Sequence, residues 1–489
     1  MGLVIRGADL DGSLKDIRIE RGTITEVAGS IDRQPGDDAI EARGGAAIPG
    51  LHDHHVHIRA WAAAQRSVLV GPPTVSDLNA LAEALRSAAA SGDGWLRAVG
   101  YHESVAGELD RHLLDRLVPH RPVRLQHRSG VLWVLNSVAL ELVGADEDDW
   151  PGIERGADGL PTGRLWRMDS WLAERLGATA RPGPTDRPGA AVGAAELAQD
   201  LAALGREAAA RGVTGWTDAT PARPRSETLA LLDAVETGTV LQRLHLMLPV
   251  DADQLTASAT CGPVKVMLDD PTLPPVEELS GIVSSAHRQG RAVAVHCVTR
   301  SQLAVAVAAF DEATPRFSKG TNFGVEGDRV EHGADIPPGY LPLLACRALT
   351  VVTQPNFVYE RGDQYLGDVD PREFPDLWRA RSLVDAGVLV AAGTDAPFGS
   401  PDPWLAVRAS VRRVSRSGRS IGADEALDWR TALRLWLGRA SNPSSARTIA
   451  AGQPADVVVL ERPLPAALNG HESVAVRATL IRGELAFQA

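Results

Sequence analysis

Short apolar runs with β-strand character alternate with helical segments through most of this 489-residue chain. Such alternation is typical of βαβ units, in which a helix returns the chain to the next strand of a parallel sheet. We count eight candidate strands, the number that a closed (β/α)8 barrel requires. In chain order they are AAIPGLHDHHVHI, VRLQHRSG, VTGWTDAT, PVKVML, AVAVHCV, DRVEHG, LTVVTQP and VLVAAGTDA.

Both ends of the chain show β-structure of a different kind. LVIRGADL and KDIRIERGTITEVAG lie near the start, and ADVVVLERPL and SVAVRATLIRGELAFQA lie near the end. Because chain termini of compact domains are often close together, we predict one small β-sandwich domain from residues 1–48 and 440–489. The predicted fold class is therefore α/β, a (β/α)8 TIM barrel over residues 49–439 with this terminal sandwich.

Two stretches of the predicted barrel do not fit the simple alternation. They cover residues of about 60–120 and 141–195, and each follows a candidate barrel strand. The loops after barrel strands build the active-site face of this fold. We therefore predict that both stretches are insertions that shape a substrate pocket.

The composition narrows the classes of partner. With 50 basic and 62 acidic residues the formal charge is -12, which argues against nucleic acid. No apolar run reaches the roughly 18–20 residues of a membrane span, and MGLVIRGADLDGSL does not resemble a signal peptide. Cys261, Cys297 and Cys346 are too scattered for a disulfide framework. We expect a cytoplasmic protein with a small-molecule substrate and no membrane partner; its oligomeric state stays open, a homodimer included.

The segment HDHHVH of the first candidate barrel strand carries the strongest local signal for chemistry. Side chains two apart on a strand share a face, so Asp53, His55 and His57 are expected on one face, and His52 and His54 on the other. Two imidazoles side by side on a rigid strand supply half of a zinc site. The alternative is a histidine-rich strand without a metal.

Later strands end in single polar residues, namely Lys265, His296, His332 and Asp395. Any one of them alone fits a satisfied core side chain. Catalytic residues of a (β/α)8 barrel come from the carboxyl ends of several strands, and these four follow in chain order at such ends. The set therefore predicts a metal site at the mouth of the barrel.

The order His-x-His, Lys, His, His, Asp resembles the amidohydrolase superfamily. The branch it most resembles is amidohydrolase family 3, which contains N-substituted formamide deformylase-like enzymes. PGLHDHHVH and GTDAP carry the resemblance most specifically, and GLPTGRL together with the NSVAL segment indicates the branch. Further supporting segments, such as ARGVTGWTDA, VKVMLDD and AAGQPADVVVL, are spread over nearly the whole chain.

The resemblance implies a role for each residue. His55 and His57 would bind the more buried metal ion, and His296 and His332 the second. Lys265 would bridge both as a carbamate; the alternative is an ion-paired lysine, with one ion, or two without the bridge. Asp395 would ligate the first ion and move protons, and Asp53 would orient a ligand imidazole. The implied cofactor is Zn²⁺, one or two ions, with Mn²⁺ or Fe²⁺ as alternatives.

These roles imply hydrolysis of a C–N bond in an amide, formamide or cyclic amide. Zinc lowers the pKa of bound water to about 7, so hydroxide would attack the carbonyl while Asp395 passes the proton to the leaving nitrogen. The same scaffold supports lactone hydrolysis, decarboxylation or isomerisation, and these stay open as alternatives. The third hypothesis is a metal-free barrel without catalytic activity.

The sequence departs from its relatives where substrate is recognised. Related enzymes often carry Asp-Gly-His after the second strand, where this chain reads Arg128, Ser129, Gly130 and Val131. Candidate substrate contacts are His127, Arg128, His102 and Gln354. For this reason the known substrate of a related enzyme does not identify the substrate of this chain.

Overall fold

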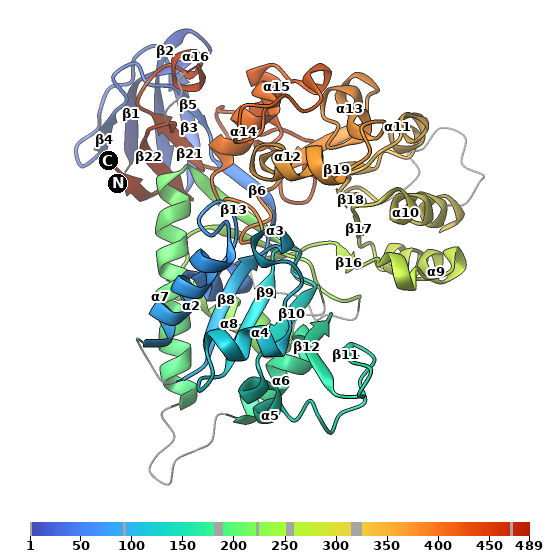
Figure 1. Cartoon of the computed structure of the whole chain (residues 1–489). Coiled ribbons are helices and arrows are strands. Elements are labelled where there is room, and N and C mark those ends of the chain that lie inside the picture. Colours follow the sequence, from blue (N-terminus) through green and yellow to red (C-terminus); the bar gives the residue numbers. More distant parts are fainter. Residues whose placement is uncertain are drawn as a thin grey trace. The chain divides into compact units, whose positions relative to one another are not determined.

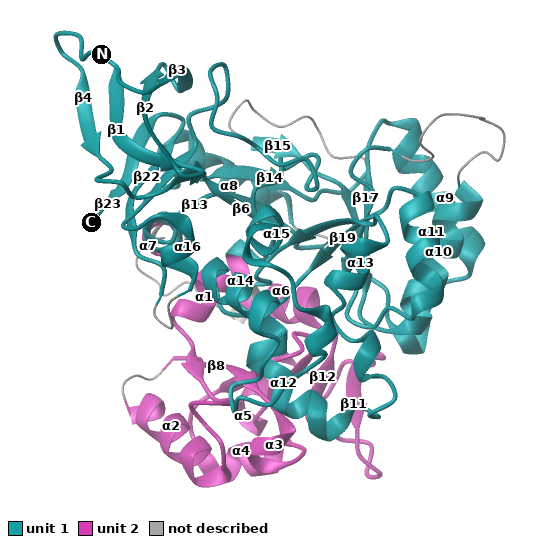
Figure 2. Cartoon of the chain, turned by 90° about the horizontal axis from the view of Figure 1, so that it is seen from above, with its two compact units in different colours: residues 1–58, 201–489 teal, residues 59–200 magenta. Residues whose placement is uncertain are grey.

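The computed structural model describes residues 2–90, 94–179, 189–221, 224–250, 259–313, 325–469 and 473–489. The chain divides into two compact units: residues 1–58 with 201–489, and residues 59–200 (Figure 2). We call them unit 1 and unit 2. Within the described part of the chain, every helix is too short or too polar to traverse a lipid bilayer.

Unit 1 is built around parallel strands, most of them buried and rich in β-branched residues. One sheet has the order β15-β14-β13-β6 and the other the order β16-β17-β18-β19-β20, with all pairs parallel. Figure 1 shows β16 to β19 following one another. Helices connect most successive strands, as a parallel sheet requires. The strands are β6 (Leu51–Val56), β13 (Val213–Asp218), β14 (Arg243–Leu246), β15 (Ala259–Cys261), β16 (Val264–Val266), β17 (Val293–Cys297), β18 (Arg329–His332), β19 (Thr350–Thr353) and β20 (Leu389–Ala392).

The two parallel sheets adjoin each other at two places, which we call seams. Only Gly262 and Pro263 separate β15 from β16. At the other seam the Asp395 N–H donates to the His55 carbonyl at 2.8 Å, and the His57 N–H donates to the Ala396 carbonyl at 2.8 Å. A Cβ added at Gly393 would lie 2.5 Å from the His55 nitrogen, so a glycine permits this close approach of β20 to β6. The arrangement is mixed α/β of the TIM-barrel type.

The choice of strands corrects one part of the sequence prediction. The run VRLQH is β9 (Val123–His127), which lies in the sheet of unit 2 and not beside β6. The neighbours of β13 are β6 and β14, and β14 was not among the candidate strands of the sequence. Its residues Arg243–Leu246 alternate polar and apolar, a pattern too short to separate a strand from the end of a helix.

The two chain ends contribute two more four-stranded sheets. Their orders are β3-β2-β1-β4 and β23-β22-β21-β5. One hydrophobic cluster contains Ile5 and Ile17 from the first sheet and Val457 and Leu480 from the second. Figure 1 shows the blue N-terminal and red C-terminal strands coming together. The strands are β1 (Leu3–Leu10), β2 (Ser13–Glu20), β3 (Thr23–Ala28), β4 (Asp38–Glu41), β5 (Ala47–Pro49), β21 (Val457–Leu460), β22 (Val476–Ile481) and β23 (Glu484–Gln488).

Unit 2 has a sheet and a core of its own. The strand order is β11-β12-β10-β9-β8-β7, with β7, β8 and β9 parallel to one another. Both predicted insertions belong to this unit, although residues 180–188 of the second lie outside the described residues. Their predicted role in shaping the pocket stays a prediction. The remaining strands are β7 (Val68–Leu69), β8 (Leu96–Tyr101), β10 (Leu132–Leu135), β11 (Ile153–Arg155) and β12 (Pro161–Trp166).

The helices of the two units are mostly short. Those that begin in the second unit are α2 (Leu78–Ala90), α3 (Glu103–Ala106), α4 (Arg111–Leu117), α5 (Ser137–Val143), α6 (Asp169–Thr179) and α7 (Gly189–Ala210). The others are α1 (Ile58–Gln65), α8 (Arg225–Glu236), α9 (Val276–Arg288), α10 (Arg300–Ala313), α11 (Leu341–Cys346), α12 (Asn356–Asp368), α13 (Arg381–Asp385), α14 (Pro403–Arg412), α15 (Trp429–Arg434) and α16 (Leu464–Leu468).

Candidate metal centre

The pairing of β6 with β13 is irregular near its histidines. Trp216 and Asp218 of β13 pair with Asp53 and Val56 of β6, so three steps on β6 oppose two on β13. Such a pairing is a β-bulge. The histidines nevertheless lie in the pairs that the predicted alternation implies, with the rings of His52 and His54 4.6 Å apart and those of His55 and His57 5.3 Å apart. The His55 and His57 side chains both contact Asp395, whereas the Asp53 carboxylate turns to Thr394.

His55, His57 and Asp395 form a compact group. The Asp395 Oδ1 atom lies 3.2 Å from His57 Nε2 and 3.6 Å from His55 Nε2. One nitrogen or oxygen atom from each of the three residues lies within 4.8 Å of the others, which is close enough to hold one metal ion. His55 and Asp395 are buried and the side chain of His57 is 15% exposed. A substrate could therefore approach from the His57 side.

The other predicted ligands join this group. The rings of His55 and His332 lie 4.7 Å apart, and those of His332 and His296 lie 4.5 Å apart. Lys265 belongs to the same neighbourhood, since its charge acts on both His55 and His332. Its Nζ atom is shielded from solvent and has no hydrogen-bond partner among the described residues. The structure thus brings together side chains from β6, β16, β17, β18 and the segment after β20.

Hydrogen bonds at Nδ1 prepare two of three imidazoles, those of His55 and His332, to bind a cation through Nε2. The Nδ1 atoms of His55, His57 and His332 contact Glu331 Oε2, Thr220 Oγ1 (3.2 Å) and Gln354 Oε1 (2.8 Å), respectively. An Nδ1–H donated to an oxygen leaves the lone pair on Nε2, the arrangement found in metal-binding histidines. Burial also lowers the pKa of His55 and of His332, which keeps these rings neutral. The donor set therefore fits a divalent metal ion.

Glu331 is a residue of the site that the sequence reasoning missed. It lies in β18 one residue before His332, is fully buried, and accepts the His55 Nδ1–H. Burial raises its pKa, but the interactions with His55 and Lys265 outweigh this and bring the pKa to about 2. The signal in the sequence was a carboxylate inside a short buried strand, because such a group is rare without a partner.

Gln354 and Asp53 act on the ligands in different ways. Gln354, a predicted substrate contact, is buried and its Oε1 accepts from His332 Nδ1. Asp53 accepts hydrogen bonds from the backbone N–H groups of His55 and Thr394 at 3.2 and 2.9 Å. Burial raises the pKa of Asp53 to about 7, although these hydrogen bonds act in the opposite direction. Asp53 therefore fixes the backbone around two ligands, whereas it was predicted to orient an imidazole.

Asp395 stays ionised in spite of its burial. Desolvation raises the pKa of its carboxyl, but the contacts with His57 and His55 and the charge of Arg361 leave that pKa below its ordinary value. Its φ of 57° and the φ of 71° at His332 place both residues in the left-handed region. Residues other than glycine adopt this region at a cost, and they do so mainly at functional sites.

A layer of buried polar groups adjoins Glu331. Arg329 lies two residues before Glu331 on β18 and its Nε is 3.5 Å from Glu331 Oε1. Both residues are fully buried, as is His54. Neither the guanidinium of Arg329 nor the ring of His54 forms a hydrogen bond within the described part of the protein. Buried polar groups of this kind are usually satisfied by internal water.

His102 and His127 lie in unit 2 and form a second cluster with Glu103. His127 Nε2 is 3.1 Å and His102 Nε2 is 3.7 Å from Glu103 Oε2. The backbone N–H groups of Ser104 and Ser129 donate to the Nδ1 atoms of His102 and His127 at 3.2 and 3.1 Å. These bonds put the ring protons on Nε2, the opposite of the arrangement that a metal requires there. The predicted substrate contact Arg128 lies beside this cluster, and the substrate role of all three stays a prediction.

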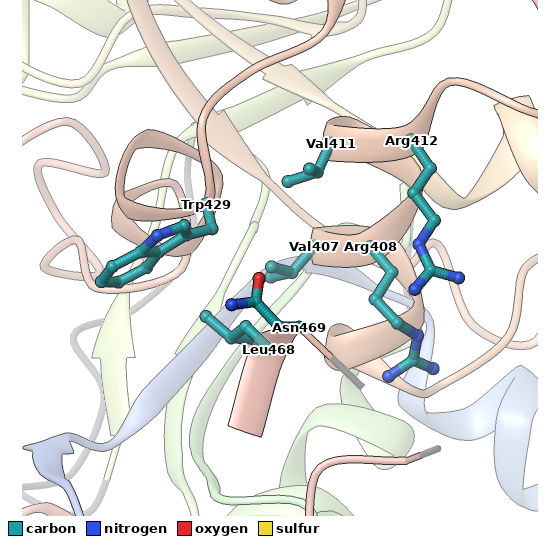
Figure 3. A pocket seen from close by; sticks show the side chains of 7 residues that line it. All are labelled: Val407, Arg408, Val411, Arg412, Trp429, Leu468 and Asn469. Atoms are coloured by element: carbon teal, nitrogen blue, oxygen red, sulfur yellow. The ribbon is translucent and has the colours of Figure 1, made fainter. Parts of the chain in front are cut away.

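A small surface pocket of unit 1 involves different residues. Figure 3 shows its lining side chains: Val407, Arg408, Val411, Arg412, Trp429, Leu468 and Asn469. They come mainly from α14 and from the region of α16. None of the predicted metal or substrate residues lines this pocket.

Imidazoles, a lysine and a carboxylate thus gather near the carboxyl ends of parallel strands, where they form a candidate metal site. The chain belongs to the amidohydrolase family, whose model matches residues 38–487. The resemblance stated from the sequence motifs is thereby confirmed.

Similar proteins agree with this assignment. The N-substituted formamide deformylase of Arthrobacter pascens is 25% identical, with 96% of this chain and 92% of the relative aligned. The putative amidohydrolase YtcJ of Bacillus subtilis is 24% identical over 96% of each chain. Among solved structures, a metal-dependent hydrolase from Pyrococcus horikoshii superposes with a TM-score of 0.70 at 18% identity, covering 94% of this chain and 98% of that one. The last likeness shows the fold.

Proposed function

We propose that this protein is a divalent-metal-dependent hydrolase that cleaves a C–N bond in an amide, formamide or cyclic amide. The observation that carries the proposal is the pair of imidazoles, His55 and His332, whose Nδ1 atoms are hydrogen-bonded to acceptor oxygens while their Nε2 atoms are left for a cation, next to His57 and Asp395. The family and the formamide deformylase relative support the bond type. We also infer that the parallel strands close into a barrel of the (β/α)8 type beside a terminal β-sandwich.

The proposed ligands are His55, His57 and Asp395 for one ion and His296 and His332 for a second. Zn²⁺ suits this set of nitrogen and oxygen donors, and Mn²⁺ and Fe²⁺ are alternatives. The buried Lys265 Nζ atom without a hydrogen-bond partner fits a bridging carbamate, because a carbamate offers oxygen ligands where an ammonium offers none. A bound divalent ion supplies Lewis acidity and lowers the pKa of a water molecule.

The residues of the chain then hold the reacting groups and move protons. Asp395 would take a proton from the attacking water and give it to the leaving nitrogen, so one carboxylate serves as base and then as acid. Its low pKa supports the first of these steps, since the group must start ionised. Glu331 keeps the Nδ1 proton of His55 in place and so keeps the Nε2 lone pair available.

Metal analysis and a substrate screen test the proposal together. We expect at least one equivalent of tightly bound divalent metal in the purified protein. We also expect hydrolysis in a panel of formamides, N-acyl amino acids and cyclic amides. Less than one equivalent of metal, with no activity gained on adding Zn²⁺ or Mn²⁺, would contradict the proposal and favour a barrel without catalytic activity. Activity on lactones alone would move the protein to a different reaction class.

A further inference from the structure

Arg361 of α12 is held rigidly beside the segment that carries Asp395. Its guanidinium stacks on the ring of Phe357 with 3.7 Å between its Cζ atom and the ring centroid. Phe357 is buried in a cluster with Trp378 and Ile421, so the surface under the guanidinium is fixed. Arg361 Nη2 donates to the carbonyl of Phe398 at 2.7 Å.

Phe398 connects this guanidinium to the candidate metal centre. The Phe398 N–H donates to the Asp395 carbonyl at 2.8 Å, and the Phe398 ring lies 5.4 Å from the ring of His57, edge to face. Arg361 therefore contacts a residue that itself contacts two of the proposed ligands. The charge of Arg361 also helps to lower the pKa of the Asp395 carboxyl, which is consistent with a nearby guanidinium.

The guanidinium has donors to spare. It carries five N–H groups, and its only hydrogen bond within the described residues is the one to Phe398. No Asp or Glu in the described ranges forms an ion pair with it. The adjacent carboxylate, Glu360, is engaged by the Ser400 N–H at 3.0 Å and by Asn356 Nδ2 at 3.1 Å. By contrast, Arg300 and Arg379 of the same unit each pair with carboxylates of the chain.

We propose that Arg361 binds a carboxylate of the substrate, so that the enzyme acts on N-acyl or N-formyl compounds bearing an acid group, such as N-acylated amino acids. A stacked guanidinium with free N–H groups matches the planar geometry of a carboxylate and can bind it through two hydrogen bonds. Because Arg361 is hydrogen-bonded to Phe398, three residues from Asp395, we expect the carboxylate and the scissile bond to be few bonds apart. This inference rests on the proposed function.

The test compares matched acid and amide substrates. The N-formyl derivatives of glycine, alanine, leucine and phenylalanine are assayed beside their C-terminal amides, with the wild-type protein, Arg361→Gln and Arg361→Lys. We expect the wild-type protein to prefer at least one acid over its amide. In Arg361→Gln, kcat/KM for that acid should fall about 10- to 100-fold, mainly through KM, while the amide changes less than about threefold. Lysine should restore part of the loss.

Arg416→Gln is the matched control. Arg416 is exposed and lies over the ring of Tyr359 at 5.2 Å, so it stacks on a ring of the same helix as Arg361. The Arg416→Gln substitution should leave kcat/KM unchanged for both the acid and the amide substrates. Equal losses for acid and amide in Arg361→Gln would overturn the proposal, because they would show that Arg361 only braces the Phe398 segment. The absence of any preference for an acid in the wild-type protein would overturn it too.

A binding measurement separates this inference from the proposed function. Calorimetric titration with the preferred N-formyl amino acid, or with the whole panel if nothing is hydrolysed, reports affinity without turnover. Acid-selective binding that Arg361→Gln abolishes, together with no hydrolysis, would keep the carboxylate site and reject the hydrolase. Hydrolysis of neutral amides with no role for Arg361 in binding would keep the hydrolase and reject the carboxylate site.

Discussion

Glu331 Oε2 accepts a hydrogen bond from His55 Nδ1, and both side chains are buried in the candidate metal centre, on strands of different sheets. The pair joins β18 to β6. It fixes which nitrogen of His55 faces Asp395, and hence which nitrogen can bind a cation. The arrangement makes the metal affinity of the centre depend on a residue that would not touch the metal.

Replacing Glu331 with glutamine should lower metal affinity about 10- to 100-fold. The amide keeps the shape of the side chain but removes the charge, and it can present an N–H to His55 in place of an acceptor. Equilibrium competition of the metal-free protein with a zinc chelator measures the change. An unchanged affinity, with an unchanged thermal midpoint, would show that Glu331 does not set the tautomer of His55.

Asp395→Asn should abolish turnover while leaving the fold intact. The amide cannot accept the proton of the attacking water, and general base catalysis is worth about 10²–10⁴ in rate. Initial rates on the best substrate of the panel, together with circular dichroism, measure the two effects separately. Wild-type rates in this variant would remove Asp395 as the general base.

Lys265→Ala should lose most activity and regain part of it with added acetate or another short carboxylic acid. The added carboxylate would supply the oxygen ligands that a carbamate provides in the wild-type protein. Activity against acetate concentration gives the rescue, and a Lys265→Met variant controls for the volume lost in alanine. An unmodified lysine in a well-resolved, metal-loaded crystal structure would contradict the bridge.

Acid sensitivity should depend on His245 of β14. Burial, with smaller contributions from the charges of Arg329 and Arg291, lowers the pKa of His245 to about 3, against 6.5 for the free side chain. Because the pKa is lowered in the folded state, between pH 6.5 and 3 the unfolded chain binds a proton at His245 that the folded protein does not bind. The contribution of His245 to the free energy of unfolding is therefore fully present above pH 6.5 and is lost as the pH falls from there towards 3.

His245→Gln should flatten this acid limb, because glutamine does not titrate and its amide can still reach Thr260 Oγ1, which lies 2.7 Å from His245 Nδ1. Urea unfolding of the metal-free protein at pH 7 and pH 5 measures the change in free energy of unfolding. His120→Gln serves as the control because His120 is exposed. A pH dependence equally steep in His245→Gln and in the wild type would assign the acid sensitivity to other groups.

Much of the centre was accessible from the sequence, because residues at the carboxyl ends of parallel strands meet whatever the details of the fold. On that ground alone, the sequence places together four residues: His55, His57, His332 and Asp395. The hydrogen-bond partner of His55 could not be predicted in the same way. Glu331 pairs with a residue 276 positions away, and nothing in its own strand indicates which imidazole it meets.

The order of the strands was harder to obtain. The run VRLQH has the composition of a barrel strand but pairs with β8 and β10 in unit 2, while the short β14 takes the place beside β13. Hydrophobic periodicity reports that a segment is a strand but not which strand is its neighbour. One of the eight candidate strands lies in unit 2, and two of the nine strands in the parallel sheets, β14 and β15, were not among the candidates.

The extra residue in β6 has a consequence for the evolution of this chain. Side chains on a strand change face with every residue, so a one-residue deletion between Asp53 and Val56 would straighten β6 and turn His55 away from Asp395. Substitutions at His54 keep the spacing and need not have this effect. Gain or loss of a single codon in this segment should therefore be tolerated far less than a change of residue type.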